Sequence, residues 1–249
     1  MSIICKSEAE MAVMRQAGKI VADTLEAIRE QIRPGVRTSV LDDTAERFIR
    51  GRGGVPAFKG YRGFPASICV SIDEMVVHGI PGERKLAAGE IVSLDVGVVY
   101  KGYVADAAST EPVGEIDEDA KRLVETTKAA LSAGIENAQV GNHLFDISNA
   151  IQKAAESAGF SVVREYVGHG IGRDMHEDPP VPNFGSPGKG PRLQAGMTLA
   201  LEPMVNAGSS EVRLQADGWT VVTSDGKRSA HFEHTIGLTE DGPRILTLS

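Results

Sequence analysis

Cysteine and long apolar runs are both scarce in this sequence, and each scarcity excludes a class of protein. The 249 residues include two cysteines, Cys5 and Cys69, which are far apart and show no CxxC spacing. We therefore expect free thiols in a reducing compartment. No stretch approaches the ~18 apolar residues that a membrane span requires, which excludes an integral membrane protein. The first residues also lack a basic segment followed by an apolar core, so we expect no signal peptide and a cytoplasmic location.

Basic residues are in deficit as well. Lys and Arg number 26 against 34 Asp and Glu, which gives a formal net charge of −8. An acidic chain without a basic tract makes sequence-specific nucleic-acid binding a poor expectation. Hydrophobic residues make up 41% and charged residues 24%, close to a soluble globular average, which argues against a disordered chain. At ~100–200 residues per domain, the length allows one large domain or two small ones.

The expected elements run through the same order twice. A capping box of Ser7 and Glu10 starts a helix that Pro34-Gly35 ends, and a second helix covers residues 39–50. Its inward residues are expected to be Val40, Leu41, Phe48 and Ile49. Hairpins follow at residues 67–78 and 91–109. The second half has helices at residues 117–137 and 144–158. Its expected strands are residues 162–167, 197–205, 219–224 and 231–238. This order predicts one antiparallel α+β domain over residues 1–249, in which two similar halves, about 7–111 and 115–240, share a core.

Two aspartates carry the sharpest chemical signal. Asp95 and Asp106 lie in the paired strands of the second hairpin, and Asp95 is set among apolar residues. A two-residue loop at Tyr100-Lys101 would place the carboxylates directly opposite one another, and a slightly different loop would leave them diagonal and still close. Like charges on one face of a sheet are destabilising, and burial increases the penalty. A divalent cation between them would remove the repulsion; the alternative is that one Asp is exposed and the other caps a turn.

The second half supplies further groups of this kind. His169 lies among glycines, and Glu202 and Glu233 lie in apolar stretches that are expected to be strands. Each alone is more often a core group than a ligand. Together, four carboxylates and one imidazole fit a two-metal site better than a single structural zinc, which favours Cys and His. Two ions ~3.5–4 Å apart can stabilise a hydrolytic transition state.

The remaining histidines divide into two groups. His78 and His176 precede turns that contain Gly or Pro, so they are candidates for proton donors or for residues that support metal ligands. The alternative for both is a surface-loop histidine. We expect His143, His231 and His234 to be structural; strand alternation puts His234 on the face opposite Glu233.

Six segments together resemble one family over nearly the whole chain. They are Val-Val-His78-Gly-Ile-Pro, Ser-Leu-Asp95-Val-Gly, Gly-Tyr-Val-Ala-Asp106, Gly-His169-Gly-Ile-Gly-Arg-Asp-Met-His176-Glu-Asp-Pro, Leu-Glu202-Pro-Met and Phe-Glu233-His-Thr. In these segments the chain resembles a type I methionine aminopeptidase of the bacterial short form. The resemblance implies the pseudo-two-fold pita-bread (creatinase/aminopeptidase-like) fold, in which two pairs of helices cover a curved antiparallel sheet. It also implies a cytoplasmic monomer without membrane or specific nucleic-acid partners, with ribosome proximity as an open idea.

The activity implied by the resemblance is removal of the N-terminal methionine from nascent proteins and peptides whose second residue is small. Its cofactors would be two divalent ions of cobalt, manganese, iron or zinc. The implied ligands are Asp95 on one ion, His169 and Glu202 on the other, and Asp106 and Glu233 between them. Glu202 would also assist proton transfer. His176 would steady the oxyanion, and His78 would contact the scissile amide and help the leaving amine.

An aromatic loop offers a candidate for the methionine pocket. Phe58, Tyr61 and Phe64 lie close together, with glycines between them. Taken alone, this loop is best explained as a hydrophobic plug over the core. The resemblance instead makes it a pocket wall, together with Cys69, Met175 and Trp219. A thioether against aromatic edges gains roughly 0.3–1.5 kcal/mol there.

Two other functions stay open on the sequence. An Xaa-Pro aminopeptidase or dipeptidase of the same fold would carry a similar ligand set, but such enzymes usually have a large extra N-terminal domain, and little sequence precedes Asp95 here. A non-catalytic binding module of this fold would be expected to lose metal ligands. This sequence has all of them.

Overall fold

The helices begin and end close to the predicted positions. The computed structural model describes residues 3–249, and its α-helices are α1 (Glu8–Arg29), α2 (Thr38–Gly51), α3 (Glu118–Asn137) and α4 (Leu144–Ser157). The predicted capping box starts α1, since the Glu10 N–H donates to Ser7 Oγ and the Ser7 N–H donates to the Glu10 carboxylate. Val40 and Phe48 were expected to face inward, but Val40 is 41% exposed and Phe48 is half-buried, because the buried stripe of α2 consists of Thr38, Leu41, Ala45 and Ile49.

All strand ladders of the described residues are antiparallel, as predicted. In the first half, β5 (Tyr103–Pro112) pairs with β4 (Ile91–Tyr100), which also pairs with β1 (Val55–Pro56) and β2 (Cys69–Ile72). In the second half, the order is β15 (Gly242–Ile245), β14 (His234–Thr239), β9 (Thr198–Leu201), β7 (Gly168–Gly170) and β8 (Glu177–Val181). Two smaller sheets are β13 (Ser229–His231), β10 (Met204–Asn206) and β6 (Ser161–Val162), and β11 (Val212–Leu214), β12 (Val221–Thr223) and β3 (Met75–Val77). The α+β class is therefore confirmed.

Several predicted strands are shorter or differently paired. Residues 197–205 form two strands, β9 and β10, because Pro203 has no N–H to donate to a ladder. Residues 231–238 are likewise broken at Phe232-Glu233, between β13 and β14, and residues 162–167 contribute only the end of β6. β3 pairs with β12 and not with β2. Asp73 at the turn has a left-handed backbone (φ 48°), and its carbonyl accepts from Ser229 N–H at 2.8 Å, which directs β3 toward the second half.

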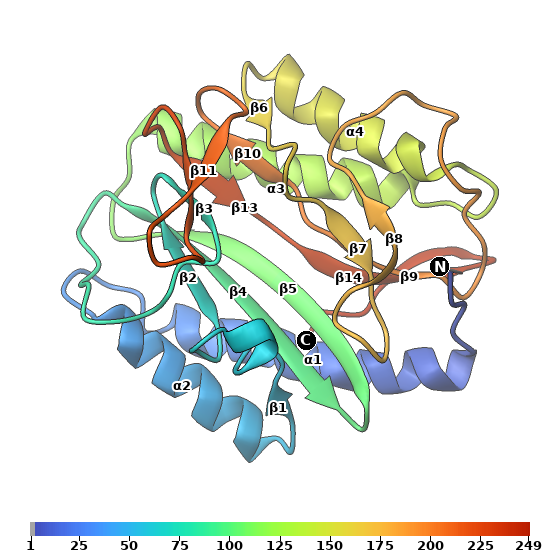
Figure 1. The fold of residues 1–249 in the computed structure, drawn as a ribbon, viewed down its shortest axis with the longest axis horizontal. Coiled ribbons are helices and arrows are strands. Elements are labelled where there is room, and N and C mark those ends of the chain that lie inside the picture. The colour runs from blue at the N-terminus through green and yellow to red at the C-terminus, as the bar shows by residue number, and fades with distance from the viewer. Residues whose placement is uncertain (1–2) are drawn as a thin grey trace.

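Each pair of helices covers its own strands. Figure 1 shows α1 and α2 below the strands and α3 and α4 above them. Beneath α1 and α2 lies one apolar cluster, with Val21, Leu41 and Leu94 among its members. Beneath α3 and α4 lies a second one, which includes Leu123 and Leu199. These two clusters lie under the helices of their own halves, and a third cluster, with Tyr103 and Ile171 among its members, contains residues of both halves. Among residues 3–249, no helix is both long and apolar enough to cross a bilayer.

The two halves meet along β5. The Glu233 N–H donates to the Ala108 carbonyl at 2.9 Å, and the Ala108 N–H donates to the Glu233 carbonyl at 3.3 Å. This pair of bonds joins the long hairpin of the first half to the break between β13 and β14 in the second. The chemistry-bearing residues collect beside this junction.

Candidate functional site

The β4–β5 hairpin places Asp95 and Asp106 on one face. Its two-residue turn is Lys101-Gly102, with φ angles of 49° and 78°. A type I′ hairpin turn requires such left-handed backbone at both central residues. Asp95 therefore lies opposite Ala108, and Asp106 opposite Gly97. Of the two predicted arrangements, the directly opposite one is wrong by two residues because the turn starts one residue later than Tyr100-Lys101, and the diagonal one is confirmed. A shift of two residues keeps the face, so the carboxylates are diagonal neighbours.

The sequence had indicated that the two glutamates lie inside strands. In the structure, both lie at breaks between strands. Glu202 follows β9 directly, and Glu233 precedes β14 directly. At both positions the ladder is interrupted and the side chain enters the space between the halves. His169 is the central residue of β7. A Cβ on Gly168 would come within 2.4 Å of the Ala200 carbonyl oxygen, so glycine at this position lets β7 lie close to β9.

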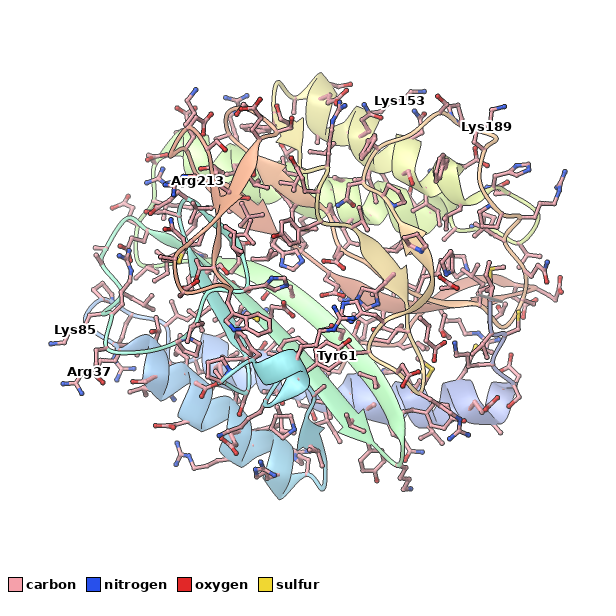
Figure 2. The ribbon with its side chains drawn as sticks, in the orientation of Figure 1. Arg37, Tyr61, Lys85, Lys153, Lys189 and Arg213 are labelled. Carbon is pink, nitrogen blue, oxygen red and sulfur yellow. The ribbon has the colours of Figure 1, made fainter. Side chains whose placement is uncertain are left out.

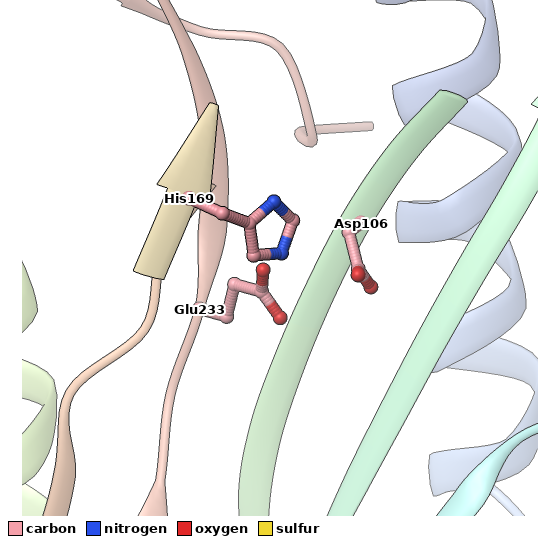
Figure 3. Close-up of side chains that lie close together, drawn as sticks. All are labelled: Asp106, His169 and Glu233. Atoms are coloured by element: carbon pink, nitrogen blue, oxygen red, sulfur yellow. The ribbon is translucent and has the colours of Figure 1, made fainter. Parts of the chain in front are cut away.

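Side chains from both halves converge at this point. Asp106, His169 and Glu233 each present one ligand atom, and these atoms lie within 4.8 Å of one another (Figure 3). His169 Nε2 is 3.6 Å from Glu202 Oε1. His169 Nδ1 lies 2.9 Å from the Gly170 carbonyl oxygen, to which it donates as Nδ1–H, leaving Nε2 free to act as a ligand. Asp95 lines the same cavity. The structure thus brings all five predicted metal-binding residues to one place.

The electrostatics of this cluster favour a bound cation. Asp95 Oδ1, Asp106 Oδ1 and Glu233 Oε1 are buried and have no hydrogen-bond partner. Burial raises the pKa of Asp95 to about 7. Burial and the neighbouring carboxylates raise the pKa values of Asp106, Glu202 and Glu233 well above their usual range. Burial also lowers the pKa of His169 to about 4, so its ring is neutral at neutral pH. Oxygen ligands with one neutral imidazole fit divalent transition metals, whose charge would compensate the carboxylates.

Two further histidines face the same cavity. His176 Nδ1 lies 2.9 Å from the Tyr61 hydroxyl, and the two rings are stacked with centroids 5.6 Å apart. The His176 ring is 4.3 Å from that of His169. His78 has a left-handed backbone (φ 60°), and its ring meets that of Tyr166 edge-on at 5.7 Å. Burial lowers the pKa of His78 to about 4 and also lowers that of His176.

The aromatic loop forms one wall of the cavity and is not a plug over the core. Tyr61 lies over the middle of the molecule, between the two helix pairs (Figure 2). Phe64 and Trp219 meet edge-on with centroids 5.1 Å apart. All the predicted pocket residues line the cavity: Phe58, Tyr61, Phe64, Cys69, His78, Met175, His176 and Trp219.

Sequence reasoning missed several members of the site. Arg62, Val77, Tyr166 and Val167 also line the cavity. Each lies within three positions of a predicted residue, so neighbourhood in sequence was the available signal. His231, expected to be structural, is 2% exposed and places Nε2 3.8 Å from Glu202 Oε2. The break at Phe232-Glu233 brings it there, and the sequence had indicated a continuous strand at this position.

The fold and the site define a metallopeptidase. The profile of metallopeptidase family M24 matches residues 12–240, and the chain belongs to this family. It is 56% identical over 245 residues to methionine aminopeptidase 1 of Bacillus subtilis, covering 98% of this chain and 99% of that one. The structure of methionine aminopeptidase from Thermotoga maritima matches with a TM-score of 0.98 and 48% identity over 100% of both chains. Prolidase from Pyrococcus furiosus matches at 21% identity with a TM-score of 0.81, over 99% of this chain and 66% of its own, which shows a common fold alone. The pita-bread fold expected from the sequence is confirmed.

Proposed function

We propose that this chain is a methionyl aminopeptidase, a hydrolase that removes N-terminal methionine when the second residue is small. The observation that carries the proposal is one cavity of about 180 Å³ that combines four carboxylates and His169 with an apolar, largely aromatic wall. Relatives at 48% and 56% identity bear this activity in their names, whereas the likeness to a prolidase concerns the fold. This favours methionine removal over the Xaa-Pro alternative. The complete set of ligand residues favours catalysis over a binding module.

The metal site would hold two divalent ions of cobalt, manganese, iron or zinc. Its ligands would be Asp95, Asp106, His169, Glu202 and Glu233. Such ions, when bound, would polarise the scissile carbonyl as Lewis acids and would lower the pKa of a water, so that it can lose a proton and attack that carbonyl. Glu202 stands at the edge of the cluster with its side chain 15% exposed, so its carboxylate can accept a proton from the attacking water and pass it to the leaving amine.

The two cavity histidines would act on the scissile bond. With the Tyr61 hydroxyl donating to His176 Nδ1, the ring proton resides on Nε2, which then donates to the oxygen that becomes negative in the transition state. Because the pKa of His176 is lowered, the ring stays neutral and keeps this tautomer at neutral pH. His78 lies across the cavity and would contact the scissile amide.

The apolar wall would select the first residue. Phe58, Phe64, Met175 and Trp219 surround the space beside the metal ligands. A methionine side chain placed there gains aromatic contacts of roughly 0.3–1.5 kcal/mol beyond the burial of its methylenes. Cys69 closes the same wall. Burial raises the pKa of its thiol well above the usual range, which keeps it neutral and compatible with an apolar ligand.

The organisation of the chain supports one working unit. We infer a single catalytic domain over residues 1–249, with halves at about 7–111 and 115–240, because ligands from both halves complete the cluster. The partner would be a peptide or nascent protein with a free N-terminal methionine. We also propose that the enzyme is a cytoplasmic monomer and that its nascent substrates bring it near the ribosome, without specific nucleic-acid or membrane binding.

One assay tests the proposal. The enzyme is stripped with EDTA, and hydrolysis of Met-Ala-Ser and of an Ala-Pro peptide is measured after addition of Co(II), Mn(II), Fe(II) or Zn(II). We expect hydrolysis of Met-Ala-Ser only after an ion is restored. Hydrolysis of the Ala-Pro peptide alone would support the dipeptidase reading instead. No hydrolysis of either peptide with any ion would point to a binding module.

A further inference from the structure

Two threonine hydroxyls flank the junction between the halves. The Asp106 N–H donates to Thr235 Oγ1 at 2.9 Å, and the same hydroxyl donates to the Asp106 carbonyl at 2.8 Å. On the other side, the His231 N–H donates to Thr110 Oγ1 at 2.9 Å, and that hydroxyl donates to the His231 carbonyl at 2.8 Å. Between the two lie the backbone bonds of Ala108 with Glu233. We call this arrangement the threonine clasp.

The clasp is symmetric about the Ala108–Glu233 pair. Thr110 and Thr235 each follow one member of that pair by two residues, and Asp106 and His231 each precede one by two residues. Both threonines are buried, at 2% and 0% exposure. Each hydroxyl both accepts from and donates to the backbone of one residue in the other half.

One side of the clasp holds a proposed metal ligand. Asp106 comes from the first half, whereas His169 and Glu233, whose ligand atoms lie near it, come from the second. Asp106 Oδ1 has no hydrogen-bond partner, and the carboxylate's contacts with the Asp95 side chain and the Ala107 backbone lie within the first half, so its position relative to the second half depends on where the backbone holds residue 106. Thr235 supplies both contacts that tie this backbone to the second half.

We propose that Thr235 is a positioning residue, whose hydroxyl sets the Asp106 carboxylate at the correct distance from Glu233 and His169. This inference rests on the proposed metal site. It predicts that Thr235 and Thr110 differ in their effect on metal affinity, which a purely stabilising role of both threonines does not predict. Thr110 makes the same contacts to His231, which is not among the proposed ligands, although Thr110 Oγ1 also lies 2.8 Å from Ser93 Oγ. Both hydroxyls should contribute to stability, and only Thr235 should contribute strongly to metal affinity.

The test compares Thr235→Val, Thr235→Ser and Thr110→Val. Valine keeps the shape of threonine and removes the hydroxyl, and serine keeps the hydroxyl. Binding of Mn(II) to the EDTA-stripped proteins is measured by isothermal titration calorimetry, and melting temperature is measured without metal. We expect Thr235→Val to weaken Mn(II) binding by about 10-fold or more, as loss of groups that orient metal ligands does. Thr235→Ser and Thr110→Val should bind like the unaltered protein, and both valine variants should melt earlier.

Several results would overturn the inference. Unchanged Mn(II) affinity in Thr235→Val, or an equal loss in Thr110→Val, would show that the clasp stabilises the junction without positioning the ligand. Should Thr235→Val not fold, Thr235→Ser decides: a weakened affinity despite the retained hydroxyl would refute the proposal, and an unchanged affinity would support it. Absence of Mn(II) binding by the unaltered protein would instead overturn the proposed metal site, and this inference with it.

Discussion

Replacement of Lys6 by methionine should disturb residues 172–177, the loop that carries His176. Lys6 Nζ forms a salt bridge with the Glu177 carboxylate, and the two side chains are only 4% and 6% exposed. Glu177 Oε1 accepts the N–H of Arg173 at 2.8 Å and that of Asp174 at 3.3 Å. Residues 172–177 thus fold around this carboxylate, and His176 belongs to that segment. The N-terminal segment is therefore coupled to the cavity.

The expected cost follows from burial. Removal of one partner from a buried ion pair leaves an uncompensated charge, which typically costs ~3–5 kcal/mol. A protein with a total stability of ~5–15 kcal/mol tolerates such a loss and stays folded at room temperature. We expect the buried Glu177 carboxylate to move toward water or another hydrogen-bond donor, and residues 172–176 to move with it. Because ~1.4 kcal/mol corresponds to a factor of ten, we expect about half of this cost to be expressed at His176 and kcat/KM to fall at least tenfold.

The assay combines denaturant unfolding with steady-state hydrolysis of Met-Ala-Ser. Lys6→Met is compared with Lys6→Met/Glu177→Gln, in which the amide oxygen can still accept the two loop N–H groups and no buried charge is left. We expect the double variant to be more stable and more active than the single one. Lys189→Met, at an exposed position, serves as the matched control and should change neither quantity. A stability loss in Lys6→Met no larger than in this control would refute the reasoning.

Three further outcomes are expected. Asp106→Asn should lower activity by several orders of magnitude while circular dichroism shows an intact fold; near-normal turnover would rule out the proposed metal mechanism. EDTA should lower the melting temperature, and re-added Mn(II) should restore it, since an ion at 100 times its Kd stabilises the folded state by ~2.7 kcal/mol; a melting temperature indifferent to both treatments would contradict a structural contribution of the metal. Hydrogen bonds from the Tyr103 hydroxyl and from Ser7 lower the pKa of Glu10 to about 2 from an ordinary value of 4.5. The ionised Glu10 carboxylate therefore stabilises the folded state above pH 4.5, and this contribution is lost as pH falls toward 2. The stability difference between the unaltered protein and Glu10→Gln should therefore shrink over that interval, and a constant difference down to pH 2 would show that the folded-state pKa is not lowered.

The sequence predicted well wherever local signals decide the outcome. The capping box at Ser7 and the break at Pro34-Gly35 located the first helix, because caps and breakers act within a few residues. The shared face of Asp95 and Asp106 was also predictable. Side-chain alternation has a period of two, so a register error of two residues left the face unchanged.

What the sequence missed depends on contacts between separate strands. β7 and β8 are rich in Gly and Pro, and they form strands because neighbours supply hydrogen bonds that propensity does not foresee. The approach of His231 to Glu202 likewise depends on breaks in two separate strands. Pro203 was a local signal for the break between β9 and β10, whereas the break at Phe232-Glu233 lies where Glu233 pairs with Ala108 of the other half, and a single-strand pattern contains no information about that partner.

The turn at Lys101-Gly102 determines where Asp106 lies in the candidate metal site. Neither turn residue lines the cavity, yet the turn sets the position of Asp106 along β5, because the pairing of β4 with β5 starts there. Surface turns generally accept insertions, because little is packed against them. Here one added residue would direct Asp106 toward the opposite face of the sheet unless a bulge absorbed it before residue 106. Chain length at an exposed hairpin tip is therefore constrained by chemistry about five residues away, about 17 Å along the strand.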